Sequence, residues 1–510
     1  MLTPLDLTIL FVYLLGVAWF GIRVGGKQTS TNDYFLGGRD LPWWAVCFSV
    51  VATETSTLTV IGVPAIAYFG TWTFLQITFG YLIGRLIVGL YFLPRYFEGE
   101  LSTAYAFLGQ RFGAKTQATA SVTFLITRLL ADGVRLFATA IPLKVILDVM
   151  GFDVSYGVII VGIGLVTIAY TLIGGIKAVV WMDVVQMGLY VGGALLSVGF
   201  LISALEPGWW SAAAEAGKTK LFDVELGRPM GEWLTMPYAL ITAVVGGAFF
   251  GMASHGTDHL IVQRLLTCRT LADSRKALYG SAFAVMFQFA LFLFVGTLLW
   301  AYYDGATLDM LGVGRGDEIY PKYIIEGLPA GLSGLLLAGI IAAAMSTLSS
   351  SLNALASSTM IDLYERFATK TLDAAKGLRL SRGFTLFWGI VFMGFASLFE
   401  DRQNPVVELG LSIASFTYGG LLGLFLLGLG NARARQSEAI VALLVSVVAM
   451  VVLYLGAWHG VDGWVWLWRP GAEQIAANEL TRIGWPWFAV IGTATAYLIG
   501  SLLALRHPSR

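Results

Sequence analysis

A cluster of hydroxyl residues lies in the middle of an apolar segment of membrane length, GIIAAAMSTLSSSLNALASSTMIDLY (339–364). Five residues of this segment follow the i, i+3, i+4, i+7 rule and so share one face of a helix: Ala343, Ser346, Thr347, Ser350 and Asn353. Such a face supplies neutral oxygen atoms, which a hard cation such as Na⁺ prefers as ligands. The alternative is a packing face, on which small residues let helices approach and hydroxyls bond to backbone carbonyls.

A second polar cluster interrupts the apolar segment 42–70. Glu54 lies there among Thr and Ser residues, and Gly62 and Pro64 follow it. Polar side chains with Gly and Pro at mid-depth predict a discontinuous helix, whose free carbonyls can coordinate a cation or a solute. A proline kink patched by hydroxyls is the alternative. A charge inside a span costs roughly 2.5–3.5 kcal/mol, so Glu54 favours the functional interpretation.

Two further acids lie in or next to apolar spans. Asp258 follows a Gly-rich span at 236–255. This span and the span at 42–70 are predicted to be weakened helices in corresponding positions of an inverted repeat. Asp183 lies a few residues inside another span. It is either the charged ligand of a second cation or an interfacial acid paired with Lys177.

An arginine also lies well inside a span. Arg135 offers the planar donor pair that binds carboxylates, so it is a candidate for the carboxylate of a solute. The alternative is an internal ion pair with one of three acids: Asp132, Glu54 or Asp258.

The composition places these residues in a membrane. The 510-residue chain is 57% hydrophobic and 13% charged, about half the charge of a soluble protein. Its apolar runs indicate an all-α polytopic membrane protein in a lipid bilayer. We expect about thirteen transmembrane helices, at 5–22, 42–70, 72–94, 117–147, 155–173, 179–204, 236–255, 277–303, 329–364, 381–399, 406–430, 437–458 and 484–506.

The charge pattern excludes several classes and gives an orientation. The net charge is zero and no basic patch suggests nucleic acid, and no obligatory protein partner is evident. No phosphate-binding loop or catalytic set stands out, so neither an ATP-driven pump nor an enzyme is expected.

Most of the 32 Lys and Arg residues fall in alternate loops, including one with Arg264, Arg269, Arg275 and Lys276. Those loops are predicted to be cytoplasmic, which puts the N-terminus outside and the C-terminus in the cytoplasm.

Five stretches resemble the sodium/solute symporter family, in the family's order and over nearly the whole chain. They are YFLGGRDLPWW (34–44), YFLPRYF (91–97), GGIKAVVWMDVVQ (174–186), HLIVQRLLTCRTLADSRKA (259–277) and AAAMSTLSSSLNALASSTMIDLY (342–364). The resemblance implies a LeuT-like 5+5 inverted repeat with discontinuous helices one (42–70) and six (236–255). The expected divisions are a leading helix and loop at 1–40, a first repeat at 41–204, a second repeat at 205–430 and two additional helices at 431–510.

The resemblance also implies one or two Na⁺ sites. The main site would use two positions on helix one and three on helix eight: Ala52, Thr55, Ala343, Ser346 and Thr347. Some members, such as the sialic acid and proline carriers, have a second site. Its positions here are Asp183, Ser349 and Ser350.

The substrate positions favour a carboxylate. Leu58 and Thr59 stand where sugar-carrying members have an acid and a glutamine, which counts against a typical hexose. Glu54 resembles the acidic position of proline-type carriers, and Arg135 the arginine that meets the carboxylate in sialic acid carriers. The expected substrate-binding residues are Glu54, Ser56, Thr59, Gln76, Arg135 and Asp258.

The sequence thus predicts a secondary active transporter of the plasma (inner) membrane. It would couple Na⁺ to uptake of a small carboxylate-bearing solute, such as an organic acid, an amino acid or a sialic-acid-like sugar, by alternating access. Three alternatives remain: a sugar or polyol symporter of the same family, a proton-coupled carrier in which Glu54 or Asp183 titrates, and a transporter-like sensor or channel.

Overall fold

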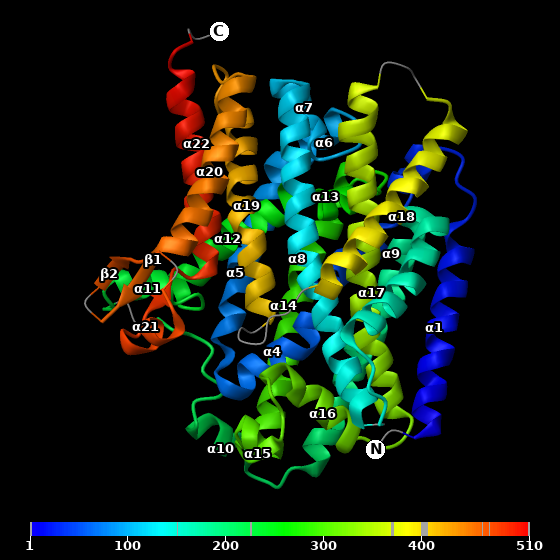
Figure 1. Ribbon diagram of the computed structural model, residues 1–510, viewed down its shortest axis with the longest axis vertical. Coiled ribbons are helices and arrows are strands. Elements are labelled where there is room, and N and C mark those ends of the chain that lie inside the picture. The colour runs from blue at the N-terminus through cyan, green and yellow to red at the C-terminus, as the bar shows by residue number, and fades with distance from the viewer. Residues whose placement is uncertain are drawn as a thin grey trace. The chain divides into compact units, whose positions relative to one another are not determined.

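In the computed structural model the described residues form mostly helices, together with one small sheet (Figure 1). It describes residues 3–149, 151–224, 227–368, 372–398, 406–461, 463–468 and 470–507. Over these residues nine helices are long and apolar enough to cross a membrane, or up to eleven if each of two bent pairs is one span. The polytopic all-α class is therefore confirmed, whereas the count of thirteen stays a prediction.

The chain divides into two compact units that interleave along the sequence. The first comprises 1–72, 128–220 and 263–410, and the second 73–127, 221–262 and 411–510. The helices within the first are α1 (Pro4–Gly25), α2 (Thr31–Leu36), η1 (Gly37–Arg39), α3 (Trp43–Glu54), α4 (Thr57–Phe69), α9 (Tyr156–Ala204), α10 (Trp209–Glu215), α14 (Leu271–Tyr302), α15 (Leu308–Leu311), η4 (Gly316–Glu318), α16 (Ile319–Glu326), α17 (Leu332–Ser358), η5 (Thr359–Glu365) and α18 (Ala374–Leu398).

The second unit contains the remaining helices and the sheet. Its helices are α5 (Ile77–Ile87), η3 (Val88–Phe92), α6 (Leu93–Glu98), α7 (Ala106–Phe112), α11 (Met230–Thr235), α12 (Leu240–Gly256), α20 (Gln436–Gly456), α21 (Ala472–Ala477) and α22 (Trp485–Ala504). Four elements contribute residues to both units: η2 (Trp72–Gln76), α8 (Ala114–Val149), α13 (His259–Leu265) and α19 (Val406–Gly430).

Both helices that the sequence predicts to be discontinuous are broken. α3 and α4 are bent by 62° at Thr55 and Ser56, whose backbones are extended. α12 and α13 are also bent by 62°. At this second break Asp258 acts as a cap, because its Oδ1 accepts the backbone N–H of Leu260 at 2.8 Å. A short polar side chain thus satisfies a backbone group at the second break, whereas at the first break Ser56 makes no side-chain cap and the Thr55 hydroxyl donates to Gln288.

α9 contains a break of a different kind. The helix is 49 residues long, but Gly175 within it has φ +56° and ψ −157°. A Cβ at this position would lie 2.6 Å from the carbonyl oxygen of Tyr34, so both the backbone conformation and the space require glycine. The sequence predicts two spans here, at 155–173 and 179–204, on either side of this glycine.

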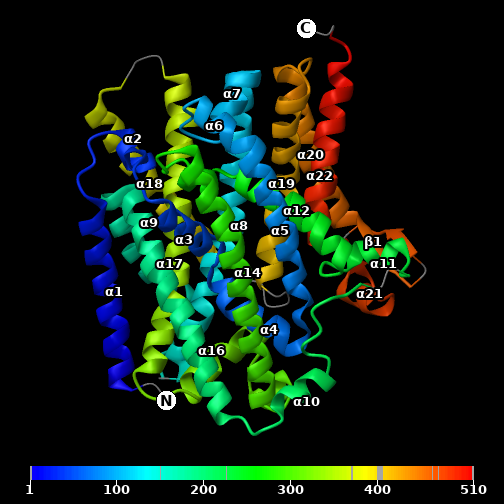
Figure 2. The ribbon, with the colours of Figure 1, turned by 180° about the vertical axis from the view of Figure 1, so that it is seen from behind.

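α17 is the central helix of the first unit. Every residue from Leu336 to Ser358 is buried, and the helix packs against α9, α1 and α3 (Figure 2). A helix buried on all sides can carry a polar face only where other protein groups satisfy it. The hydroxyl face of the sequence 339–364 therefore faces other helices rather than lipid.

The start of α1 is fixed by a cap that also joins it to α17. The hydroxyl of Thr3 accepts the N–H of Asp6 at 3.4 Å, and the Asp6 carboxylate accepts the N–H of Thr3 at 2.8 Å. The second carboxylate oxygen accepts the backbone N–H groups of Gly331 and Gly334, each at 2.8 Å. One buried acid therefore caps α1 and holds the beginning of α17.

In the second unit α5 and α12 pack closely through glycines. A Cβ on Gly80 would lie 2.5 Å from the carbonyl oxygen of Val244 and 2.7 Å from the backbone nitrogen of Ala248. Small residues let two helix backbones approach in this way, as is common in membrane proteins.

The sequence analysis did not predict the sheet, which lies in the segment 457–482. It comprises β1 (Ala457–Gly460), β2 (Gly463–Trp466) and β3 (Thr481–Arg482), in the order β2-β1-β3, with antiparallel pairs such as Ala457↔Trp466. The Arg482 guanidinium lies 3.9 Å from the ring centroid of Tyr454 and 4.5 Å from that of Trp458. This stacking joins β3 to β1 and to the end of α20.

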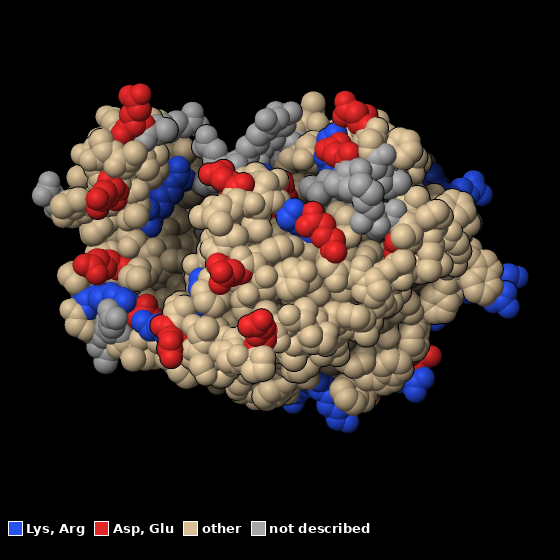
Figure 3. All heavy atoms as spheres, turned by 90° about the horizontal axis from the view of Figure 1, so that it is seen from below, with Lys and Arg blue, Asp and Glu red and all other residues tan. Residues whose placement is uncertain are grey.

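The long loops of the first unit contain short helices. α10 lies in the first of these loops, and α15 and α16 lie in the second. Figure 3 views the end of the molecule to which these three helices contribute. Among the described residues drawn in this view, acidic side chains are scattered over a mostly uncharged surface, and several of them lie beside Lys or Arg.

Candidate ion and solute sites

The hydroxyl face of α17 meets the broken end of α3 inside the first unit. Ser346 Oγ donates to the carbonyl oxygen of Ala52 at 3.3 Å, while Thr347 Oγ1 donates to that of Ala343 at 3.2 Å. The Thr55 hydroxyl is turned to Gln288 of α14, at 2.8 Å. α3 can therefore offer an ion mainly its carbonyl oxygens, and α17 its hydroxyls, and the main Na⁺ site on these residues stays a prediction.

Asp183 of α9 lies beside this group of oxygens. Its carboxylate accepts a hydrogen bond from Ser346 Oγ at 2.6 Å and another from Ser49 Oγ at 2.5 Å. The Asp183 side chain has no exposed surface. The single hydroxyl proton of Ser346 is therefore shared between the Ala52 carbonyl and the Asp183 carboxylate, and the contact with Asp183 is the shorter one.

Arg264 is the counter-charge of Asp183, and here the sequence interpretation was wrong. It assigned Arg264 to a cytoplasmic loop, but the side chain is fully buried at the end of α13, with Nη2 3.3 Å from Asp183 Oδ2. The guanidinium also donates to Ser49 at 3.0 Å and to Ser350. The missed signal was Asp183 itself, because a buried acid needs a partner of opposite charge.

The two serines predicted for the second ion site have different partners. Ser350 binds the Arg264 guanidinium, which also pairs with Asp183. Ser349 Oγ donates to the carbonyl of Ser346 on its own helix, at 3.1 Å. The structure therefore groups Asp183 with Ser346, Ser49 and Ser350, with Arg264 among them.

A second charged cluster lies where α8 faces α17. Asp132 Oδ1 is 3.2 Å from Arg135 Nη1 and 3.3 Å from Arg128 Nη1, and its other oxygen accepts the hydroxyl of Ser351. The internal ion pair that the sequence left open for Arg135 is thus formed with Asp132. However, Asp132 is shared, and the buried Nε of Arg135 has no hydrogen-bond partner among the described residues.

Arg135 lines a small cavity together with residues of the broken helix and of α17. The lining residues are Ser56, Asp132, Arg135, Leu136, Thr139, Ala344, Thr347 and Leu348. Its volume is about 10 Å³, enough for about one water. Thr347 belongs to both the cavity and the predicted ion site, so the two sites share an α17 residue.

The other predicted substrate residues fall in two groups. Glu54 ends α3 and Thr59 is buried in α4, on either side of the break. Gln76 and Asp258 contact residues of the second unit: Gln76 Nε2 donates to the Tyr238 carbonyl at 2.7 Å, and Asp258 accepts the hydroxyl of Tyr418. The roles of Gln76 and Asp258 at a substrate site stay predictions.

Comparison with known proteins gives the family of the chain. The family model described as "Sodium:solute symporter family" matches residues 34–446. The sodium/sialic acid symporter of Proteus mirabilis is 28% identical over 459 residues, covering 89% of this chain and 90% of the relative. The human sodium-coupled monocarboxylate transporter 1 is 28% identical over 447 residues, covering 86% of this chain and 70% of the relative.

One solved structure supports the fold over the whole chain. A substrate-bound, outward-open Na⁺-coupled sialic acid symporter, described as revealing a novel Na⁺ site, is 26% identical, with a TM-score of 0.82. The match covers 99% of this chain and 98% of that one. The chain belongs to the sodium:solute symporter family, and it is a Na⁺-coupled solute symporter.

Proposed function

We propose that the transported solute is a carboxylate-bearing sugar acid of the sialic acid class, and that Arg135 binds its carboxylate. One observation carries this proposal. Arg135 lines the cavity next to Thr347, and its Nε is a buried donor with no partner among the described residues. A buried guanidinium donor left unsatisfied is costly, and a carboxylate is the acceptor whose geometry fits it.

The relatives support an anion. The names of the Proteus mirabilis and human proteins refer to sialic acid and to monocarboxylates, and both solutes are anions at neutral pH. Ser56 and Thr139, which carry hydroxyl groups, line the same cavity, and residues of this kind suit a polyhydroxylated sugar acid once the cavity has opened. Glu54, Thr59, Gln76 and Asp258 are further candidates for the same solute.

We propose that the main Na⁺ lies between α3 and α17, held by Ala52, Thr55, Ala343, Ser346 and Thr347. A second Na⁺ at Asp183, Ser349 and Ser350 requires Arg264 to move from the carboxylate, because both cations would use the same oxygens. Binding of the main ion fixes the broken helix, which also carries Ser56 of the solute cavity. Ion and solute therefore stabilise each other's binding.

The cavity volume is consistent with alternating access. A space of about 10 Å³ cannot hold a sugar acid, so the helices around it must separate before the solute binds. We propose that this opening occurs by rocking of two inverted repeats, 41–204 and 205–430, within a set of thirteen helices. The segments 1–40 and 431–510 flank the repeats, with the N-terminus outside and the C-terminus in the cytoplasm.

The test is uptake into sealed proteoliposomes. Radiolabelled N-acetylneuraminate, lactate, proline and glucose are offered separately, with an inward Na⁺ gradient or with K⁺ in its place. We expect Na⁺-dependent accumulation of N-acetylneuraminate alone or in clear preference. Preferred uptake of glucose or proline, or uptake that persists without Na⁺ and stops with a protonophore, would overturn the proposal.

The ion number is tested in the same vesicles. A monoanionic solute with one Na⁺ carries no net charge, whereas with two Na⁺ it carries one positive charge. Each inward charge gains roughly 2.3 kcal/mol per 100 mV. If the second site is used, an inside-negative potential imposed with K⁺ and valinomycin should therefore raise accumulation, and if one ion is used it should leave accumulation unchanged.

A further inference from the structure

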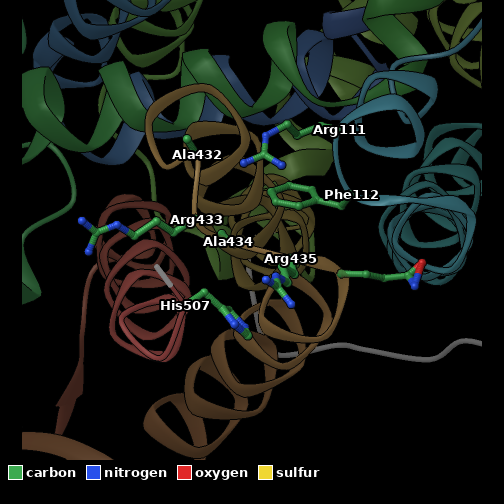
Figure 4. Close-up of a pocket in the computed structure, with 8 residues that line it drawn as sticks. Arg111, Phe112, Ala432, Arg433, Ala434, Arg435 and His507 are labelled. Carbon is green, nitrogen blue, oxygen red and sulfur yellow. The ribbon is translucent and has the colours of Figure 1, made fainter. Parts of the chain in front are cut away.

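A basic cavity lies in the second unit, where the ends of α7, α19 and α22 meet the start of α20. Its volume is about 270 Å³. The lining residues are Arg111, Phe112, Ala432, Arg433, Ala434, Arg435, Gln436 and His507 (Figure 4). None of them belongs to the ion and solute sites. Three arginines and a histidine contribute to it, and no Asp or Glu is among these described lining residues.

Arg111 is held in place at one side of the cavity. Its Nη2 donates to the carbonyl oxygen of Asn431 at 2.6 Å, and its Nε to that of Gly428 at 3.2 Å. These carbonyls are at the C-terminal end of α19, where a cation is favoured. The guanidinium is therefore fixed before any ligand binds.

The opposite side is formed by the α19–α20 loop and the end of α22. Glu438 fixes both: its Oε2 accepts the backbone N–H of Arg435 at 2.9 Å, and its Oε1 lies 3.2 Å from His507 Nε2. In Figure 4 the Arg111 side chain enters from the α7 end and His507 from the end of α22. The side chains of Arg433 and Arg435 are exposed, so they can reorient toward a ligand.

Apolar side chains are exposed within a few residues of this basic lining. On α22 Leu502 is 64% exposed and Leu505, next to the helix end, 65%; on α20 Val441 is 44% exposed. In a membrane protein such residues contact acyl chains. A ligand that matches both features has an anionic head and an apolar tail.

We propose that this cavity binds the phosphate headgroup of an anionic phospholipid. Guanidinium groups bind phosphate oxygens through paired N–H donors, and basic pockets between helices at the cytoplasmic side of a membrane bind lipid headgroups. The predicted orientation puts these helix ends on the cytoplasmic side. The exposed leucines favour a lipid over a free phosphate, because a soluble anion has nothing to place against them.

The experiment measures lipid retention by native mass spectrometry of the full-length protein in detergent. Phosphatidylglycerol, phosphatidylcholine and inorganic phosphate are added separately. We expect the protein to retain phosphatidylglycerol and little phosphatidylcholine. We also expect phosphatidylglycerol to raise the unfolding temperature and inorganic phosphate to raise it much less. The double variant Arg433→Gln/Arg435→Gln should bind phosphatidylglycerol at least about tenfold more weakly.

Two control variants separate this site from general surface charge. Arg379→Gln removes an exposed positive charge on α18 and should leave phosphatidylglycerol binding unchanged. Ala432→Trp fills the cavity while keeping every charge, and should weaken binding as the double variant does. Equal loss in Arg379→Gln, or no loss in Ala432→Trp, overturns the proposal. Stabilisation by inorganic phosphate as large as that by phosphatidylglycerol would assign the cavity to a soluble anion instead.

Discussion

Arg264 and Asp183 form an ion pair that is completely buried in the first unit, with Nη2 3.3 Å from Oδ2. The guanidinium shares Asp183 and Ser49 with the hydroxyl network that reaches Ser346. A cation that belongs to the chain therefore lies beside the residues predicted to hold a second Na⁺. The state of this pair decides whether that carboxylate is available to an ion.

Removing the arginine alone should be more harmful than removing both charges. Arg264→Gln leaves Asp183 buried without a counter-charge, and breaking a buried pair in this way costs about 3–5 kcal/mol. The double variant Arg264→Gln/Asp183→Asn leaves no charge and should recover part of the loss. Thermal unfolding in detergent measures both. An unfolding temperature of Arg264→Gln equal to that of the wild type would contradict the structural role of the pair.

Asp183→Asn separates one coupled ion from two. If the carboxylate holds a second Na⁺ during transport, the variant should show a Na⁺-to-solute ratio lower by one and a loss of voltage dependence. The ratio is measured from the solute gradient that balances imposed Na⁺ gradients in proteoliposomes. An unchanged ratio in a variant that still transports would assign Asp183 to the ion pair alone.

Ser346→Ala and Thr347→Ala test the main Na⁺ site. Each removes one hydroxyl ligand, so the Na⁺ concentration for half-maximal uptake should rise about tenfold or more, as expected for a lost charge-assisted contact. Ser446→Ala is the matched control, because it also removes a buried hydroxyl, which donates to Gly492 in the second unit. If Ser346→Ala and Thr347→Ala needed no more Na⁺ for half-maximal uptake than the control Ser446→Ala, the main Na⁺ site could not lie at these two residues.

Arg135→Lys should retain the positive charge but lose the paired donors that match a carboxylate. We expect the KM for N-acetylneuraminate to rise by about one to two orders of magnitude, and Arg135→Gln to abolish saturable uptake. Lys144→Gln on the same helix removes a cation whose partners are Asp148 and Asp153, and should transport normally. A wild-type KM in Arg135→Lys would show that the carboxylate binds elsewhere.

Gly80→Ala tests the close packing of α5 and α12. The added Cβ would lie 2.5 Å from the Val244 carbonyl oxygen, a backbone atom that cannot move alone, so the helices must separate. We expect a loss of about 1–3 kcal/mol in stability, seen as a lower unfolding temperature. Gly192→Ala is the control, because a Cβ there meets no atom within 4 Å. Equal unfolding temperatures would contradict the packing argument.

The sequence was most informative where polar residues interrupt long apolar runs. The breaks at Thr55–Ser56 and near Asp258 were predicted because hydroxyls, an acid and Pro or Gly have few other reasons to lie at that depth. The helical face around Ser346 was predicted from spacing alone. Both features depend on local sequence, which a single chain displays directly.

Features that depend on distant residues were harder to predict. Arg264 looked like one more basic residue of a cytoplasmic loop, because its partner Asp183 belongs to another helix. Likewise the pairing of Ala457 with Trp466, and the stacking of Arg482 on Tyr454, need contacts that no local pattern specifies. Small strands with few residues give a weak alternation signal, and the aromatic residues there also suit an irregular loop.

Arg264 and Asp183 are in contact but lie far apart in the sequence, and this has a consequence for biosynthesis. The two residues are 81 positions apart, and the segment between them includes 221–262 of the other unit. When the ribosome has made α9, Ser49 already exists but Arg264, Ser346 and Ser350 do not. Asp183 therefore enters the bilayer without Arg264, its partner in the folded structure, and its apolar neighbours in α9 offset the insertion cost of roughly 2.5–3.5 kcal/mol. The ion pair is completed late, so a nascent chain that ends before α13 holds Asp183 without the partner that it has in the folded structure.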